Sequence, residues 1–139
     1  MKTYKLFLDD VRRPIQCAQY MNQPQIYYDV DWVVATDCTE FKKVIKERFE
    51  YGEFPAIISF DHDLAPEHYS ASDFKHMVSR HSKIPESSCS LTGMDAARWI
   101  VDFCMDNNLK LPAFRVHSMN PAGRENIESF LTQFARAQN

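Results

Sequence analysis

Short runs of apolar and β-branched residues are spaced along the chain, and each is followed by polar positions. Runs of this length that end at acidic or loop-forming residues are typical of buried β-strands. The first and the third run end abruptly at aspartates. The predicted strands are residues 4–8, 31–36, 55–60 and 112–117.

Between the predicted strands, apolar residues recur at helical spacing. The predicted helices are residues 40–51, with Thr39 as N-cap and Gly52 after the end; residues 93–108, with Thr92 as N-cap; and a last helix that begins at Asn120 and Pro121. Residues 11–22 predict a loop with a short helix, and residues 23–28 are ambiguous.

The alternation of strands and helices predicts one α/β domain, a three-layer αβα arrangement around a parallel sheet of about four strands. A length of 139 residues fits a single domain. Residues 64–91 interrupt the pattern, because they are rich in serine and histidine but poor in large apolar residues. This insertion is either a lid or binding loop or a tolerated surface insertion, with one short helix within residues 73–80.

Charge, hydropathy and cysteine content disfavour several classes of protein. The 16 Lys and Arg against 19 Asp and Glu give a net charge of −3, which disfavours general coating of nucleic acid. No apolar run approaches the roughly 20 residues of a membrane span, and no signal peptide is recognisable. Cys17, Cys38, Cys89 and Cys104 form no CxxC pair, so we expect reduced, mostly buried thiols in a cytoplasmic protein rather than a zinc site.

Polar and charged side chains follow all four predicted strands. In an open parallel sheet, ligands bind at the carboxyl ends of the strands, so these side chains are expected to converge. They are Asp9, Asp10 and Arg12 after the first strand; Thr36 and Asp37 after the second; Asp61, His62 and Asp63 after the third; and His117, Ser118 and Asn120 after the fourth.

The aspartates predict a divalent-cation site. Crowded carboxylates repel one another unless a cation compensates their charge, and Mg²⁺ or Mn²⁺ takes carboxylate oxygens together with a phosphate. The candidate ligands are Asp9, Asp10, Asp61 and Asp63. The alternative is that Asp9 and Asp10 are loop or capping acids.

The remaining candidate residues suit the binding of a phosphate and catalysis at it. His62 and His117 could flank one phosphate as general acid and base, ligate the metal, or be structural. Ser118, Asn120 and Gly123, at the start of the last helix, form a candidate anion cradle, and the alternative is an ordinary Asn cap. Arg12 and Arg124 are candidate phosphate clamps, or partners of nearby acids.

The combination LDDVR, FDHDL, TGMDAARW and HSMNPAG resembles the receiver-like domains of the predicted cyclic-phosphate processing group, divergent relatives of two-component receiver domains. The resemblance implies a flavodoxin- or receiver-like sheet of order 2-1-3-4. The fifth strand and the lysine typical of receivers are missing. By analogy with receivers, Asp9 and Asp10 would hold Mg²⁺, Asp61 would be the phosphoacceptor, and Ser118 would contact the phosphoryl group.

The leading functional hypothesis is a metal-dependent phosphoesterase that processes a cyclic phosphate of a nucleotide or RNA end. Water could attack directly, or Asp61 could act as nucleophile. One alternative is a signalling module phosphorylated on Asp61; another is a non-catalytic module that binds a nucleotide or a partner protein. Tyr27, Tyr28 and Trp32 could stack on a base, although a place in the core is the preferred interpretation.

Overall fold

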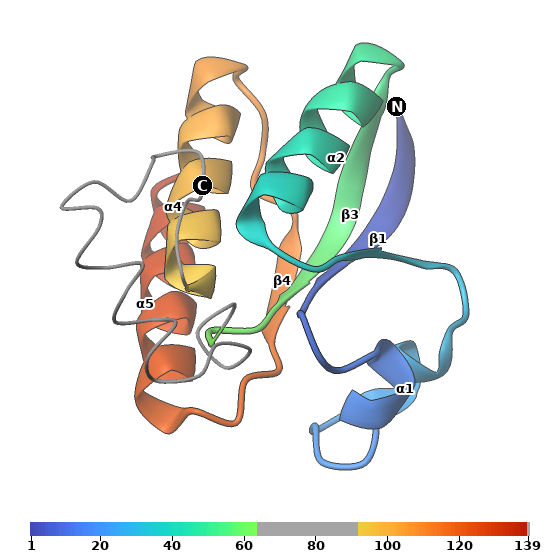
Figure 1. Ribbon diagram of the computed structural model, residues 1–139. Helices are drawn as coiled ribbons and strands as arrows, with labels where there is room; N and C mark the ends of the chain where they lie inside the picture. The colour runs from blue at the N-terminus through green and yellow to red at the C-terminus, as the bar shows by residue number, and fades with distance from the viewer. Residues whose placement is uncertain (64–91, 139) are drawn as a thin grey trace, which may run out of the picture.

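The computed structural model describes residues 1–63 and 92–138, in which a four-stranded parallel sheet is the central layer (Figure 1). The strands are β1 (Lys2–Leu8), β2 (Trp32–Ala35), β3 (Glu53–Phe60) and β4 (Ala113–Val116). Their order, β2-β1-β3-β4, confirms the predicted receiver-like topology. The insertion predicted at residues 64–91 lies outside the described residues.

Helices of unequal size cover the two faces of the sheet. The long helices α2 (Cys38–Glu50), α4 (Gly93–Asp106) and α5 (Pro121–Ala137) pack on one face, where Leu6, Ile58 and Val116 belong to one apolar cluster with residues of all three helices. The short α1 (Pro14–Cys17) and the 3-10 helix η1 (Pro24–Tyr28) contribute to a smaller cluster around Phe7 on the opposite face. Residues 23–28, ambiguous in the sequence, are thus mostly a 3-10 turn.

The N-cap of α2 is Asp37, and the prediction of Thr39 is wrong. The Asp37 carboxylate accepts a hydrogen bond from the backbone N–H of Glu40 at 2.7 Å, and its backbone is extended, as at most N-caps. The Glu40 carboxylate in turn accepts from the N–H of Thr36 at 2.7 Å. The helix therefore starts at Cys38, two residues earlier than predicted.

Helix α4 begins where its sequence predicts, but it is capped differently. Thr92 occupies the N-cap position, yet its side chain makes no capping bond to the backbone; the hydroxyl donates to the Asp95 carboxylate at 3.2 Å. The helix ends at Asp106, two residues before the predicted end, and Asn108 adopts a left-handed backbone with φ of 54°.

Strand β3 starts at Glu53, although Pro55 follows two residues later. Proline cannot donate to a sheet ladder and is tolerated where the pairing is irregular. Here Tyr4 of β1 pairs with Pro55 and Lys5 pairs with Ile57, so one extra residue bulges from β3 at this point.

Tyr27 and Trp32 are buried, as the core interpretation predicts, whereas Tyr28 is 59% exposed. Cys17, Cys38 and Cys104 are free and buried. Burial raises the pKa of the Cys17 and Cys104 thiols to about 11, which leaves them protonated near neutral pH. Among the described residues, we find no helix with the length and apolarity that a membrane crossing requires.

Candidate metal and phosphate site

The sheet itself fixes three of the predicted site residues. Asp9, Asp61 and His117 each follow the last residue of a strand. These strands, β1, β3 and β4, are neighbours in the parallel sheet, so their carboxyl ends lie at the same end of it (Figure 1). The backbone N–H of each bonds to the neighbouring strand or its end: Asp9 to Ala35 at 3.1 Å, Asp61 to Leu8 at 2.9 Å and His117 to Phe60 at 2.9 Å. The side chains therefore start from a rigid ladder rather than from a free loop.

These three side chains point to one place. A carboxylate oxygen of Asp9, one of Asp61 and a ring nitrogen of His117 all lie within 4.8 Å of one another. Asp9 and His117 are fully buried and Asp61 is 2% exposed. We call these residues, together with Arg12, the carboxylate cluster.

Both oxygens of the Asp9 carboxylate accept hydrogen bonds. Oδ1 accepts hydrogen bonds from the backbone N–H groups of Val11 at 2.8 Å and Arg12 at 2.9 Å, and Oδ2 lies 2.9 Å from Nε2 of His117. Burial alone would raise the pKa of Asp9, but these hydrogen bonds outweigh it and hold that pKa below its usual value. Asp9 is therefore an anion at neutral pH.

Arg12 supplies positive charge to both acids of the cluster. Its guanidinium nitrogen Nη1 is 3.7 Å from Oδ2 of Asp9 and 3.9 Å from Oδ1 of Asp61. The Arg12 side chain is 30% exposed, and it also lies over the Tyr20 ring. It can therefore reach both the buried carboxylates and a ligand that arrives from solvent.

His117 belongs to a chain of buried hydrogen bonds that the sequence analysis missed. Its Nδ1 lies 2.7 Å from the Ser59 hydroxyl, which lies 2.7 Å from the Tyr27 hydroxyl. Its ring stacks on Phe7 at 4.4 Å. Burial lowers the pKa of His117 despite the opposing effect of Asp9, so the ring is neutral at neutral pH. We call Tyr27, Ser59, His117 and Asp9 the buried relay.

His62 lies in a second group of residues, at the start of α5. Nδ1 of His62 is 2.9 Å from Oδ1 of Asp63, and the same oxygen accepts a hydrogen bond from the side chain of Asn120 at 3.2 Å. A side chain on Gly123 would collide with the His62 ring. The structure thus places the two candidate histidines in different groups, and we call His62, Asp63, Asn120 and Gly123 the His62 cluster.

At the start of α5, the backbone N–H groups of Asn120 and Gly123 are already bonded to side chains of the same segment. The side-chain oxygen Oδ1 of Asn120 accepts a hydrogen bond from the N–H of Gly123 at 3.0 Å. The backbone N–H of Asn120 donates to the Ser118 hydroxyl at 3.1 Å. Pro121 has no N–H to offer. The ordinary Asn cap is therefore present, and Ser118 is 1% exposed.

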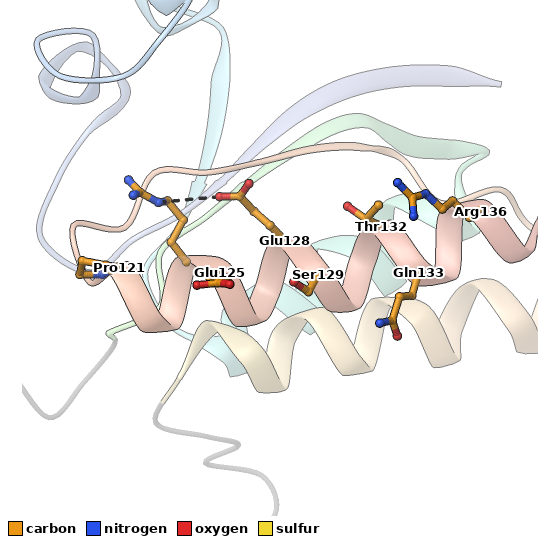
Figure 2. A pocket seen from close by; sticks show the side chains of 8 residues that line it. Pro121, Glu125, Glu128, Ser129, Thr132, Gln133 and Arg136 are labelled. Atoms are coloured by element: carbon orange, nitrogen blue, oxygen red, sulfur yellow. Dashed lines mark ion pairs between the residues drawn. The ribbon is translucent and has the colours of Figure 1, made fainter.

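Arg124 projects from α5 and pairs with Glu128 at 3.8 Å, the ion pair dashed in Figure 2. It lines a surface hollow of about 560 Å³ on the outer face of the helix, together with polar residues such as Ser129 and Arg136 (Figure 2). Neither Asp9 nor Asp61 lines this hollow. Arg12, rather than Arg124, is the arginine at the carboxylates.

The donor set of the carboxylate cluster fits a divalent cation. Asp9 and Asp61 bring two buried carboxylates to one point, and Asp10, partly buried, is adjacent in the chain. Oxygen donors of this kind suit Mg²⁺ or Mn²⁺. Asp63, the fourth predicted ligand, has one oxygen bonded to His62 and Asn120.

One feature of the sequence indicates the buried hydrogen bonds of Ser59 and Tyr27. Ser59 is a polar residue inside the otherwise apolar run of β3, and it is fully buried. A polar side chain at such a position needs a hydrogen-bond partner. The sequence does not say which one, because Tyr27 and His117 come from distant segments.

A family model described as the cyclic-phosphate processing receiver domain matches residues 4–133. No curated protein and no solved structure gives a significant match. The matched range includes Asp9, Asp61 and His117, and the observed strand order agrees with a receiver-like sheet. The chain therefore belongs to the family of cyclic-phosphate processing receiver domains.

Proposed function

We propose that the protein is a metal-dependent phosphoesterase that hydrolyses a cyclic phosphate of a nucleotide or of an RNA end. The observation that supports this most directly is the meeting of two buried carboxylates, Asp9 and Asp61, with one partly exposed arginine, Arg12. Membership of the cyclic-phosphate processing family supports the choice of substrate class.

Asp9 and Asp61 would hold the cation, with Asp10 beside them. A bound Mg²⁺ or Mn²⁺ polarises a phosphoryl oxygen and lowers the pKa of bound water. The backbone N–H groups on Oδ1 of Asp9 orient its carboxylate in advance. Asp61 is oriented by its position at the end of β3.

Arg12 would bind the phosphate. A guanidinium is planar and presents paired donors to two oxygens of a phosphate. Arg12 lies within 3.9 Å of both acids, so an ester bound there has positive charge on the side that Arg12 occupies. That charge stabilises the negative charge that builds on the non-bridging oxygens during attack.

The side chain of His62 is more accessible than that of His117, so we assign the proton transfer to His62. Nδ1 of His62 donates to Asp63, which leaves Nε2 as the basic nitrogen, and the side chain is 18% exposed. Both nitrogens of His117 are engaged, and its ring has no exposed surface. In the reaction, a water oxygen forms a bond to phosphorus and one ester P–O bond of the ring breaks. The proton lost by water is passed to the leaving alkoxide, which gives a phosphomonoester.

The test combines turnover and binding. Purified protein is assayed with Mn²⁺ or Mg²⁺ against 2′,3′- and 3′,5′-cyclic nucleotides and an RNA that ends in a 2′,3′-cyclic phosphate. We expect Asp61→Asn to lose at least about 100-fold in kcat/KM, and Arg12→Gln and His62→Gln about 10- to 100-fold each. Mn²⁺ at 100 times its Kd stabilises a native site by about 2.7 kcal/mol, so it should raise the melting temperature of wild type but not of Asp61→Asn.

Matched controls come from exposed residues outside the site. Asp106→Asn and Arg136→Gln carry the same chemical changes on α4 and α5 and should leave turnover unchanged. Absence of turnover on the whole panel would overturn the proposal. A stoichiometric, base-labile adduct on Asp61 after incubation with a small phosphodonor would favour the signalling function instead. Ligand-induced stabilisation without product would favour a binding module.

A further inference from the structure

One direction of hydrogen bonding satisfies every member of the buried relay. An ionised carboxylate only accepts, so the contact between Asp9 Oδ2 and His117 Nε2 needs a proton on Nε2. In the neutral ring, Nδ1 is then an acceptor, and it receives the Ser59 O–H. The Ser59 oxygen in turn accepts the Tyr27 O–H. Each hydrogen in the chain has an acceptor in this arrangement.

The other protonation states satisfy the chain less well. With the proton on Nδ1 alone, a nitrogen lone pair would face the Asp9 carboxylate at 2.9 Å. With both nitrogens protonated, Ser59 would accept from His117 and donate to Tyr27, and the Tyr27 proton would have no acceptor within the relay. A buried polar hydrogen without an acceptor is unfavourable by about 1–3 kcal/mol.

The surroundings allow the ring little freedom to turn. Phe7 stacks on one face of His117 with an interplanar angle of 6°, and the Tyr27 ring meets it edge-on. Tyr27 is itself stacked on Trp32, whose indole N–H is bonded to the Ile26 carbonyl at 3.0 Å. The imidazole is therefore held by packing as well as by its hydrogen bonds.

We infer that Asp9 and Ser59 together hold His117 as the Nε2–H tautomer, with Ser59 as a positioning residue, so that the ring donates to Asp9 and stays out of the coordination sphere of the cation. Among the described residues, the ligands of the cation are then oxygens only. This inference rests on the metal centre of the proposed function. It assigns a role to His117, the histidine of the carboxylate cluster. A histidine ligand would favour softer ions, whereas an oxygen-only set suits Mg²⁺ and Mn²⁺.

Two measurements on the wild-type chain test the inference without any assay of activity. Nitrogen-15 NMR of histidine-labelled, metal-free protein should show His117 as the Nε2–H tautomer. Pulsed EPR of the Mn²⁺-loaded protein should show no hyperfine coupling from a nitrogen of His117 bound directly to the ion, with His117→Gln as the reference spectrum. An Nδ1–H tautomer, or a coupling that disappears in His117→Gln, would overturn the inference.

Variants separate the relay from general effects on folding. Ser59→Ala removes the donor to Nδ1, so the Nδ1 resonance should move from its wild-type position while Asp9 still keeps the proton on Nε2. Mn²⁺ affinity should fall about tenfold, as for other outer hydrogen-bond partners of metal sites. Ser59→Thr keeps the hydroxyl and should restore both the Nδ1 resonance and the Mn²⁺ affinity of wild type. Tyr27→Phe keeps the Ser59 contact and should preserve the tautomer. Tyr28→Phe and Ser129→Ala are matched controls on exposed positions and should match wild type.

The failures of the two proposals are distinguishable. If Mn²⁺ does not bind, the proposed function is overturned, while the tautomer in the metal-free protein still decides whether the relay is ordered as inferred. If Mn²⁺ binds and Ser59→Ala changes neither the Nδ1 resonance nor the affinity, the positioning role of Ser59 is wrong and the metal centre stands.

Discussion

Two glycines let the backbone segments of the site approach closely. Gly93, the first residue of α4, donates its N–H to the His62 carbonyl at 2.8 Å, and a Cβ there would collide with the backbone carbonyl of Asp61. A Cβ on Gly123 would instead collide with the His62 ring. One glycine thus supports the carboxylate cluster, and the other supports the His62 cluster.

Alanine at these two glycines should therefore have different effects. In Gly93→Ala the obstacle is backbone, so Asp61 has to move, and we expect Mn²⁺ affinity to fall at least about tenfold, as when a partner of a metal ligand is lost. In Gly123→Ala the His62 side chain has to move, which should reduce turnover but leave Mn²⁺ affinity near the wild-type value. Both changes overpack a buried site and should destabilise the fold by about 1–3 kcal/mol.

Calorimetric titration with Mn²⁺ and denaturant unfolding of both variants check this prediction. Ser129→Ala on the exposed face of α5 is the control for a small change of side chain. Equal loss of Mn²⁺ affinity in the two glycine variants would contradict the separation of the clusters.

The convergence of Asp9, Asp61 and His117 could be predicted because parallel strands deliver the residues after them to one edge. The division of labour between the histidines could not be predicted in the same way. It depends on Ser59, on Tyr27 and on the packing of Phe7, none of which adjoins His117 in the sequence. Residue type alone gives no reason to prefer either His62 or His117 as the residue that transfers protons.

At the scale of elements, helix α2 shows how local hydrogen bonds set a boundary. Asp37 and Thr39 are both residue types that cap helices. The chain leaves β2 at Ala35, and Asp37 is the residue with an extended backbone from which the side chain reaches the N–H of Glu40. Capping preference alone does not choose between candidates two positions apart.

Asp37→Ala should lower the free energy of unfolding by about 1 kcal/mol, the usual effect of losing an N-cap side chain. The physical reason is that the N–H of Glu40 loses its acceptor at 2.7 Å. Urea unfolding of this variant and of Lys43→Ala, an exposed position on the same helix, measures the difference. A loss in Asp37→Ala no larger than in Lys43→Ala would show that the cap contributes little.

Strand β3 shows a second limit of prediction from the sequence. The predicted strand begins at Pro55, whereas β3 begins two residues earlier, at Glu53. The bulge between the Tyr4 and Lys5 pairings absorbs Pro55 and extends β3 back to Glu53. Such an irregularity depends on the partner strand and cannot be inferred from the run itself.

For the whole molecule, the order of the elements was the most predictable feature. Strand and helix periodicities alternate clearly, and parallel pairing leaves few topologies. The unequal covering of the two faces was not predicted, since it follows from how short α1 and η1 are in three dimensions.

Acid should destabilise the molecule in two steps. Below pH 6.5 the unfolded chain protonates His117 while the buried ring stays neutral, because its folded pKa is lowered; stability is therefore lost as the pH falls from 6.5 towards that folded pKa. Asp9 also has a lowered folded pKa, so a further loss follows below pH 3.8. One proton contributes a slope of at most about 1.4 kcal/mol per pH unit.

Thermal and urea unfolding between pH 8 and pH 3, at constant ionic strength, measures this dependence. His117→Gln should be less stable at neutral pH but should show a shallower decline between pH 6.5 and pH 4. The same steepness in the variant and in wild type would show that another group dominates the first step.

The stacking of Trp32 on Tyr27, at 5.8 Å between ring centroids and 7° between planes, gives the molecule an internal optical reporter. Tyr27 is two hydrogen bonds from His117, and Phe7 contacts both Trp32 and His117. Trp99 belongs to the other apolar cluster and can be replaced by Phe to leave a single indole. We then expect the fluorescence of Trp32 to change when a cation binds at Asp9, without any added dye.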